Sequence, residues 1–346
     1  MLMVLALMAT LWGVGHLARL SFALRLAMLG CVWLGVVVLL MWLPDGHALR
    51  VAIGGSARGW LVGGGAVALI LGYRAALSAL RHNGKPPPEP ARADSFRPAE
   101  LERYARHIIL REIGGQGQKR LKEAKVLVVG AGGLGSPALL YLAASGVGTI
   151  GVIDDDVVEN SNLQRQVIHT DDRIGMPKVQ SAVAAMKALN PFVALIPHQA
   201  RLDDSSAALI AQYDLILDGS DNFDTRYRVN RLAVAAAKPL LSAAITQWEG
   251  QISLYHPARG GPCYECVFPV RPAPGMVPSC AEAGVAAPLP GVIGSLMAME
   301  AVKHLTGAGQ GLRGRLMIYD ALYAETRVIG IKPRAACPVC GDLQTG

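Results

Sequence analysis

Three glycines and an aspartate carry the first chemistry that the chain suggests. The stretch VLVVGAGGLG, residues 126–135, is typical of a buried strand that ends in a turn at Gly130, Gly132 and Gly135 and leads into a helix. Glycines at such a turn let the backbone approach a phosphate, whose charge is favoured by free N–H groups and the helix dipole. Asp154 ends the next strand, about 20 residues on, where a carboxylate accepts ribose hydroxyls. The pattern serves NAD and ATP equally.

A polar, cationic loop after this second strand separates the two nucleotides. Residues 154–182 contain Asn162, Gln164, Arg165 and Lys178. Their donors and two positive charges suit a triphosphate and the pyrophosphate that forms when its α-phosphorus is attacked. A dehydrogenase has little use for such groups at this place. The loop therefore favours adenylation, and a membrane-bound NAD-dependent oxidoreductase is the alternative.

Four of the six cysteines form two C-x-x-C pairs, Cys263 with Cys266 and Cys337 with Cys340. Four thiolates suit a tetrahedral Zn²⁺. The pairs lie far apart in the sequence, so the ion would join the end of the chain to its middle. A redox dithiol and a disulfide are the alternatives, but two such pairs in a cytoplasmic domain favour structural zinc.

The chain alternates strands and helices from the glycine turn onward. This order predicts an α/β fold with a doubly wound, mostly parallel Rossmann-like sheet. Two later segments, 250–256 and 314–322, alternate apolar and polar residues as antiparallel strands do, and they predict an antiparallel extension. The expected strands are 126–129, 149–153, 193–196 and 214–217, and the expected helices are 136–145, 177–189 and 204–211.

The first 81 residues have the composition of a membrane region. Residues 26–43 form an uncharged apolar run of 18 residues, long enough to span a bilayer as a helix. A second run reaches spanning length only over about 53–73, and 1–15 is a shorter third candidate. No basic residue precedes Leu2 and no A-x-A site follows, which disfavours a cleaved signal peptide. We expect two transmembrane helices, about 26–43 and 53–73.

Charge predicts the orientation of this hairpin. The loop between the two spans carries only Asp45, Arg50 and Arg58, whereas more basic residues flank the outer ends. Positive flanks stay in the cytoplasm, so the rest of the chain is expected there, tethered to the inner membrane. The flanking residues are Arg19 and Arg25 before the first span, and Arg74, Arg81, Lys85, Arg92 and Arg97 after the second.

The basic balance follows from this membrane region. The formal net charge is +7, and residues 1–100 contribute nine Lys or Arg and four Asp or Glu, that is +5 of it. A membrane flank explains the excess, so no nucleic-acid partner is expected. Residues 82–100 have the proline and polar content of a semi-rigid linker, which places the globular domain at 101–346.

Nine motifs in this domain resemble the E1-like adenylyltransferases that activate ubiquitin-fold sulfur carriers, the MoeB/ThiF/HesA family. The resemblance covers residues from about 100 to 341, in the order that the family has. The motifs are GAGGLG, SNLQRQ, GMPKV, DLILDGSDN, EGQISLY, PCYEC, CAEAGV, LPGVIGSLMAMEAVK and CPVC.

The resemblance implies roles for individual residues. Gly133 and Asp154 match positions that hold the phosphates and ribose of ATP. The residues matching those that steady the phosphates and neutralise charge in the transition state are Asn162, Arg165 and Lys178. Asp221, in GSDN, matches an acidic residue associated with Mg²⁺ and the nucleotide. Arg106, in RYARHIIL, matches an arginine that reaches into the neighbouring subunit's site, which implies a homodimer.

The implied reaction is attack by the carrier's C-terminal glycine carboxylate on the α-phosphate of ATP, which gives a carrier acyl-adenylate and pyrophosphate. A carrier of the molybdopterin-synthase small-subunit type, ending in Gly-Gly, is favoured, and the thiamin sulfur-carrier type is next. Cys280, in PSCAEAGV, corresponds to a crossover-loop cysteine that bonds covalently to the carrier in some relatives and is dispensable in others.

Two features of the chain set limits on this resemblance. The membrane hairpin is outside the family pattern, and no rhodanese domain follows Cys340, so sulfur is expected from a separate donor protein.

A tRNA-modifying dehydratase of the same superfamily would usually lack the double C-x-x-C. A docking protein without activity would have lost the nucleotide residues, which are all present.

Overall fold

The computed structural model describes residues 2–18, 20–44, 46–54, 56–82, 96–273 and 283–344. The chain divides into two compact units, residues 1–90 and 91–346. Most of the expected linker, 83–95, lies outside the described residues. The division expected from the sequence, with boundaries at 81 and 100, stays a proposal.

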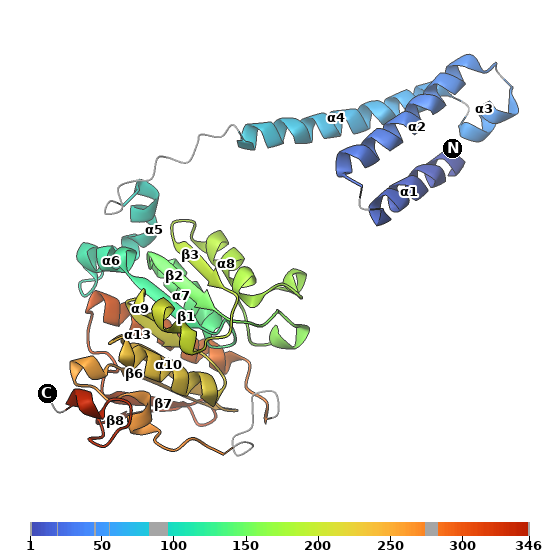
Figure 1. Ribbon diagram of the computed structural model, residues 1–346. Helices are drawn as coiled ribbons and strands as arrows, with labels where there is room; N and C mark the ends of the chain where they lie inside the picture. The colour runs from blue at the N-terminus through green and yellow to red at the C-terminus, as the bar shows by residue number, and fades with distance from the viewer. Residues whose placement is uncertain are drawn as a thin grey trace. The chain divides into compact units, whose positions relative to one another are not determined.

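The described residues of the first unit form four helices, α1 Leu2–Leu17, α2 Phe22–Trp42, α3 Ala48–Ile53 and α4 Ala57–His82 (Figure 1). Two segments are long and apolar enough to cross a membrane: Leu24–Trp42, with mean hydropathy 2.3, and Ala48–Arg74, with mean hydropathy 1.2. Only 17% and 6% of these windows are buried inside the unit, which distinguishes them from core helices of a water-soluble domain. The helix α1 is apolar but shorter.

One close contact joins the two long helices. The indole ring of Trp33, on α2, lies where a side chain at Gly64 on α4 would stand, since a Cβ there would come within 2.4 Å of the ring. The indole N–H of Trp33 donates to the carbonyl of Trp60 at 2.9 Å. The two helices therefore pack closely at Gly64, where no side chain intervenes. The hydrogen bond gives the polar N–H of the Trp33 ring a partner within the protein.

The second unit is built on one eight-stranded sheet, in the order β3-β2-β1-β4-β5-β6-β7-β8. The strands β1 to β5 run parallel, and β6, β7 and β8 add on as antiparallel neighbours. This is the predicted doubly wound sheet with its antiparallel extension. In chain order the strands are β1 Lys125–Val129, β2 Thr149–Ile153, β3 Ala194–His198, β4 Leu215–Asp218, β5 Leu240–Ile245, β6 Glu249–Tyr255, β7 Arg315–Asp320 and β8 Glu325–Gly330.

Helices cover both faces of this sheet (Figure 1). Side chains of β1 alternate between two cores, with Val126 and Val128 in the one that contains α7, α8 and α13, and Leu127 and Val129 in the one that contains α10. A strand buried on both faces is the expected setting for a continuous apolar run. The helices are α5 Pro98–Ile109, α6 Gly114–Glu123, α7 Gly135–Ser145, α8 Lys178–Leu189, α9 Ala207–Ala211, α10 Phe223–Ala235, α11 Tyr264–Val267 and α13 Pro288–Thr306.

Short 3₁₀ turns complete the unit, and one of them corrects a prediction. The expected helix 204–211 is a 3₁₀ turn, η3 Asp204–Ser206, followed by the five-residue α9. The carboxylate of Asp203 accepts from the N–H and hydroxyl of Ser205, and these local bonds compete with a regular helix start. The other 3₁₀ turns are η1 Asn160–Asn162, η2 Asp171–Arg173, η4 Pro257–Arg259 and η5 Gly341–Gln344.

Candidate active site

The glycine turn lies at the carboxyl end of β1, between β2 and β4, where the strand order changes direction. Ligands of doubly wound sheets bind at this crevice. Gly130 has φ +92°, and a Cβ there would meet the carbonyl oxygen of Gly219 at 3.2 Å. A Cβ at Gly135 would lie 1.9 Å from the carbonyl oxygen of Gly130. Only glycine fits either position, so the turn is held tight against the 219–221 loop.

The start of α7 presents free donors at this turn. Its N-cap residue, Leu134, makes no side-chain capping bond, and the buried hydroxyl of Ser136 has no hydrogen-bond partner among the described residues. Uncapped N–H groups at the positive end of a helix dipole favour an anion. The turn therefore fits the phosphates of a nucleotide.

Asp154 directly follows β2 and binds the glycine turn. One carboxylate oxygen accepts from the N–H of Ala131 at 2.7 Å, and the other accepts from the N–H of Asp156 at 2.9 Å. Burial raises the pKa of Asp154, while these two bonds and the nearby charge of Lys178 lower it. Each oxygen keeps a second lone pair, so the carboxylate retains the capacity to accept ribose hydroxyls.

Lys178 opens α8 and is nearly buried, at 7% side-chain exposure. Its ammonium group lies 2.7 Å from the carboxylate of Asp156, which is 65% exposed. Carboxylate oxygens of Asp154, Asp155 and Asp156 lie within 4.8 Å of one another. The lysine is thus fixed by an ion pair beside the acidic residues that follow β2, and its charge acts on Asp154, which binds the glycine turn.

Three further predicted residues come from the turn η1 and the residues after it. The amide oxygen of Asn162, which is buried, accepts from the N–H of Glu159 at 3.1 Å. Arg165 donates to the carbonyl of Ser161 at 3.0 Å, and its stem would lie 3.9 Å from a Cβ at Gly133. Gln164 is exposed and donates to the carbonyl of Val285 at 3.4 Å. The stem of Arg165 therefore lies beside the glycine turn, and its guanidinium group is held on the carbonyl of Ser161.

A buried network fixes the loop that carries Asp221. Asp218, at the end of β4, accepts from the hydroxyls of Ser220 at 2.6 Å and Ser242 at 2.8 Å. Arg226 forms an ion pair with Asp218 at 3.7 Å and donates to the carbonyl of Ser220. Asp221 itself is exposed. The sequence analysis missed Asp218 and Arg226, although Asp218 closes a strand at the same edge as Asp154.

A buried histidine also holds the glycine turn. The Nε2 atom of His169 lies 2.9 Å from the carbonyl oxygen of Ala131, and its Nδ1 atom lies 2.9 Å from the hydroxyl of Ser181. Burial lowers the pKa of His169, and the charges of Lys178 and Arg173 lower it further. Sequence reasoning missed this residue too, because a single histidine in a polar loop carries no recognisable pattern.

Two predicted residues are not joined to this group. Arg106 is exposed on α5, and within the described part of one chain no hydrogen bond or ion pair links it to the glycine turn. Cys280 lies in 274–282, outside the described residues. The roles of both stay proposals.

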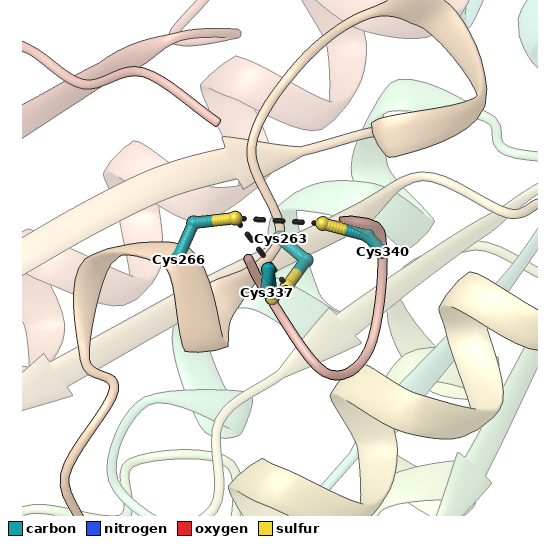
Figure 2. A group of neighbouring side chains, drawn as sticks. All are labelled: Cys263, Cys266, Cys337 and Cys340. Atoms are coloured by element: carbon teal, nitrogen blue, oxygen red, sulfur yellow. Dashed lines mark hydrogen bonds between the residues drawn. The ribbon is translucent and has the colours of Figure 1, made fainter. Parts of the chain in front are cut away.

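The four C-x-x-C cysteines converge from two distant segments (Figure 2). All four are buried, and their sulfur atoms lie 3.9 Å apart for Cys263 and Cys266, 3.6 Å for Cys263 and Cys337, and 3.4 Å for Cys266 and Cys340. Four sulfurs around one zinc at about 2.3 Å would be roughly 3.8 Å apart. The cluster fits a structural zinc site.

The surroundings of the cluster suit a metal better than free thiols. Burial raises the pKa of Cys263, and it raises the pKa of Cys340 to about 11, so four thiolates need a cation to exist together there. The backbone N–H of Arg334 donates to the sulfur of Cys266 at 3.3 Å, which is a typical contact of a metal-bound thiolate. The spacing of sulfurs also exceeds that of a disulfide.

The sequence profile of the ThiF family matches residues 104–339, which include the glycine turn, the cationic loop and all but the last of the four cysteines. The chain belongs to the ThiF family. The helices of residues 2–82 lie outside the matched part.

Curated relatives support an E1-like member of this family. The chain is 51% identical over 251 residues to the sulfur carrier protein adenylyltransferase of Thermus thermophilus, covering 71% of this chain and 93% of the relative. It is 49% identical over 244 residues to the SAMP-activating enzyme E1 of Haloferax volcanii, covering 70% and 90%. The adenylyltransferase and sulfurtransferase MOCS3 of Bos taurus is 46% identical over 260 residues, covering 75% and 57%.

Solved structures share the fold. E. coli MccB with MccA-N7isoASN superposes with a TM-score of 0.62 at 25% identity, covering 69% of this chain and 74% of that chain. PaaA superposes with a TM-score of 0.60 at 24% identity, covering 75% and 81%. The likeness to PaaA is one of fold alone.

Proposed function

We propose that this adenylyltransferase of the ThiF family activates the C-terminal glycine of a ubiquitin-fold sulfur carrier that ends in Gly-Gly. The observation that carries the proposal is an uncapped glycine turn with the stem of Arg165 beside Gly133 and with Lys178 near Asp154, which binds the turn. Two cations at that place suit a triphosphate and the pyrophosphate that leaves. The names of the relatives and the family match support adenylation over the oxidoreductase alternative.

Each residue has a part in the proposed reaction. The N–H groups of Gly132, Gly133 and Gly135 at the start of α7 cradle the phosphates, and Asp154 accepts the ribose hydroxyls. Gly130 shapes the turn, since its own N–H donates to the carbonyl of Ile153 at 2.9 Å. Asn162, Gln164 and Lys178 orient the triphosphate, and Arg165 stabilises the charge that develops when the carrier carboxylate attacks the α-phosphorus. Asp221 would hold Mg²⁺, which offsets charge at the phosphates when bound.

The double C-x-x-C cluster favours sulfur-carrier activation over the tRNA-modifying dehydratase alternative. We propose a carrier of the molybdopterin-synthase small-subunit type, with the thiamin type as the second candidate, and hence a place in molybdenum cofactor or thiamin biosynthesis. Exchange of labelled pyrophosphate into ATP by the full-length chain tests both. Exchange that depends on either carrier supports the proposal and identifies the pathway, and ATP exchange without any carrier would contradict it.

Cys280 is the proposed point of covalent attachment to the carrier. Its thiolate would attack the activated carbonyl, release AMP and form a thioester, before a separate donor protein supplies sulfur. Because adenylation precedes any use of this thiol, Cys280→Ala is expected to leave pyrophosphate exchange within about twofold of wild type. The same change is expected to abolish a carrier–enzyme adduct that thiols cleave, visible on non-reducing gels. An adduct that persists in the variant would remove Cys280 from the reaction.

We propose that the segments Leu24–Trp42 and Ala48–Arg74 anchor the enzyme in the inner membrane, with the adenylation domain in the cytoplasm. The greater positive charge outside the hairpin loop supports this orientation, as does the need for ATP. Reporter fusions at Gly346 and within 44–52 are expected to report opposite sides of the membrane, with Gly346 inside. A periplasmic signal at Gly346 would contradict both the topology and the function.

A homodimer is proposed on the exposed apolar surface of α7 and α13. A groove of about 770 Å³ runs between these helices, and its lining includes Leu140, Tyr141, Val292, Leu296 and Met299. Tyr141 and Met299 are 56% and 57% exposed. Contiguous exposed apolar residues mark a protein interface. A second copy on this face would allow Arg106 to reach the neighbouring site, as the family resemblance implies.

A further inference from the structure

Both polar groups of Ala131, in the middle of the glycine turn, are held by side chains. Its N–H donates to Asp154 at 2.7 Å, and its carbonyl oxygen lies 2.9 Å from Nε2 of His169. The sequence analysis assigned Asp154 to the nucleotide and gave His169 no role. The turn is therefore clamped between the end of β2 and a residue of the cationic loop.

The hydrogen-bond partners of His169 fix which ring nitrogen carries the proton. The carbonyl of Ala131 accepts only, so Nε2 must donate to it. Burial and the charges of Lys178 and Arg173 lower the pKa of His169, which keeps the ring neutral, and Nδ1 then accepts from the hydroxyl of Ser181. Ser181 lies on α8, three residues after Lys178, so the histidine joins the glycine turn to the helix that positions that lysine.

Because the peptide group is planar, the bond between His169 and the carbonyl of Ala131 also orients the N–H of Gly132. The carbonyl of Ala131 and the N–H of Gly132 belong to one trans peptide and point in opposite directions. With the carbonyl fixed on His169, the N–H of Gly132 points away from the histidine, and it makes no hydrogen bond with any residue in the described part of the chain. Without the histidine, a glycine-rich turn has other peptide orientations available at little cost.

We propose that His169 is a positioning residue for ATP: through its bond to the carbonyl of Ala131, it holds the 131–132 peptide so that the Gly132 N–H faces the phosphates. The inference rests on the proposed function, because it assumes that the turn binds ATP. The proposal predicts that ATP binding weakens when the side-chain donor at the Nε2 position is lost, and that it does not weaken when that donor is kept.

Two substitutions separate this role from a general structural one. Glutamine places an amide donor near the Nε2 position and keeps the bond to Ala131, whereas asparagine places one near Nδ1 and keeps only the Ser181 contact. For the full-length chain in detergent, calorimetric titration with α,β-methylene-ATP and Mg²⁺ is expected to give about tenfold weaker binding for His169→Asn, the effect of about one hydrogen bond, and binding within about twofold of wild type for His169→Gln.

Kinetics and stability complete the test. In pyrophosphate exchange, His169→Asn is expected to raise KM for ATP by about tenfold with kcat nearly unchanged, because the contact is present in both ground and transition states. Tm without nucleotide should fall alike for the two variants. Equal binding by His169→Asn and wild type overturns the inference, as does equal weakening by both variants. Failure of the wild-type chain to bind the analogue overturns the proposed function as well.

Discussion

Replacing Arg165 with alanine is expected to lower carrier-dependent pyrophosphate exchange by about a hundredfold or more, as for the loss of one preorganised charge contact to a transition state. The stem of this side chain lies beside Gly133 of the glycine turn, and in the proposed reaction its guanidinium group reaches the phosphates, where negative charge accumulates as the carrier carboxylate attacks ATP. The loss should appear mainly in kcat, with a smaller change in KM for ATP, because the contact is strongest in the transition state. Initial rates at varied ATP concentration give both constants.

Two control variants interpret that loss. Arg165→Lys keeps the charge but loses the planar donor pair, and we expect activity between that of wild type and Arg165→Ala. Arg228, on α10, forms an ion pair with Asp204 at 3.2 Å. Arg228→Ala removes a cation of the same kind from this pair, and we expect pyrophosphate exchange to be unchanged. Exchange by Arg165→Ala at the wild-type rate would remove Arg165 from the site.

Mixing two inactive variants extends this result to the proposed dimer. If Arg106 completes the neighbouring site, a dimer of one Arg165→Ala and one Arg106→Ala chain holds one intact site. Random reassociation of equal amounts should restore about a quarter of wild-type activity, since about half of the dimers are mixed and each has one working site. No recovery after denaturation and joint refolding, with recovery of a wild-type control, would contradict the shared site.

Loss of the cysteine cluster is expected to have the largest effect on stability. We expect one zinc per chain by elemental analysis, and Cys337→Ser should lose it. The ion would join residues 263–266 to 337–340 and so secure the end of the chain, which follows the exposed edge strand β8. Loss of the zinc should lower the free energy of unfolding by at least about 5 kcal/mol, which is a fraction of the binding energy of a structural zinc. A decrease of that size should lower Tm by roughly 10 °C or more in a domain of this size.

An exposed cysteine provides the matched control for this variant. Cys31 lies on α2, away from the cluster in sequence, and Cys31→Ser should retain the zinc and the wild-type Tm. A chelator that strips zinc from the wild-type chain should reproduce the loss seen in Cys337→Ser. A wild-type chain that binds no zinc, or one that keeps its Tm after a chelator has removed the metal, would contradict the zinc site.

Most strands in the core of the fold could be predicted from sequence because they are buried on both faces, although the buried strand β5 was not predicted. The apolar run 126–129 and the strand 149–153 match β1 and β2 to within one residue. The edge strand β8 was not predicted, since all six of its residues are exposed and no alternation marks it. The helix α6 was missed as well, because its sequence GGQGQKRLKE contains three glycines and depends on packing against α13 rather than on helix propensity.

The residues of the candidate site also differ in how well the sequence predicts them. The glycine turn, Asp154 and the four cysteines stand in local patterns whose spacing reflects the chemistry directly. Two buried residues of the site act only through tertiary contacts: His169 bonds to the carbonyl of Ala131 in the glycine turn, and Arg226, on α10, donates to the carbonyl of Ser220. A single histidine in a loop or a single arginine on a helix looks like any surface residue until its burial is known, which is why neither was predicted from the sequence.

The most direct test of the central claim is the mass of the product. The full-length chain is incubated with ATP, Mg²⁺ and a purified carrier that ends in Gly-Gly, and the carrier is analysed by intact-mass spectrometry after acid quenching. We predict that the carrier gains one adenylyl group, that pyrophosphate is released, and that a carrier without its last glycine is not modified. A carrier that stays unmodified with ATP, across both the molybdopterin-synthase and thiamin types, would contradict the account.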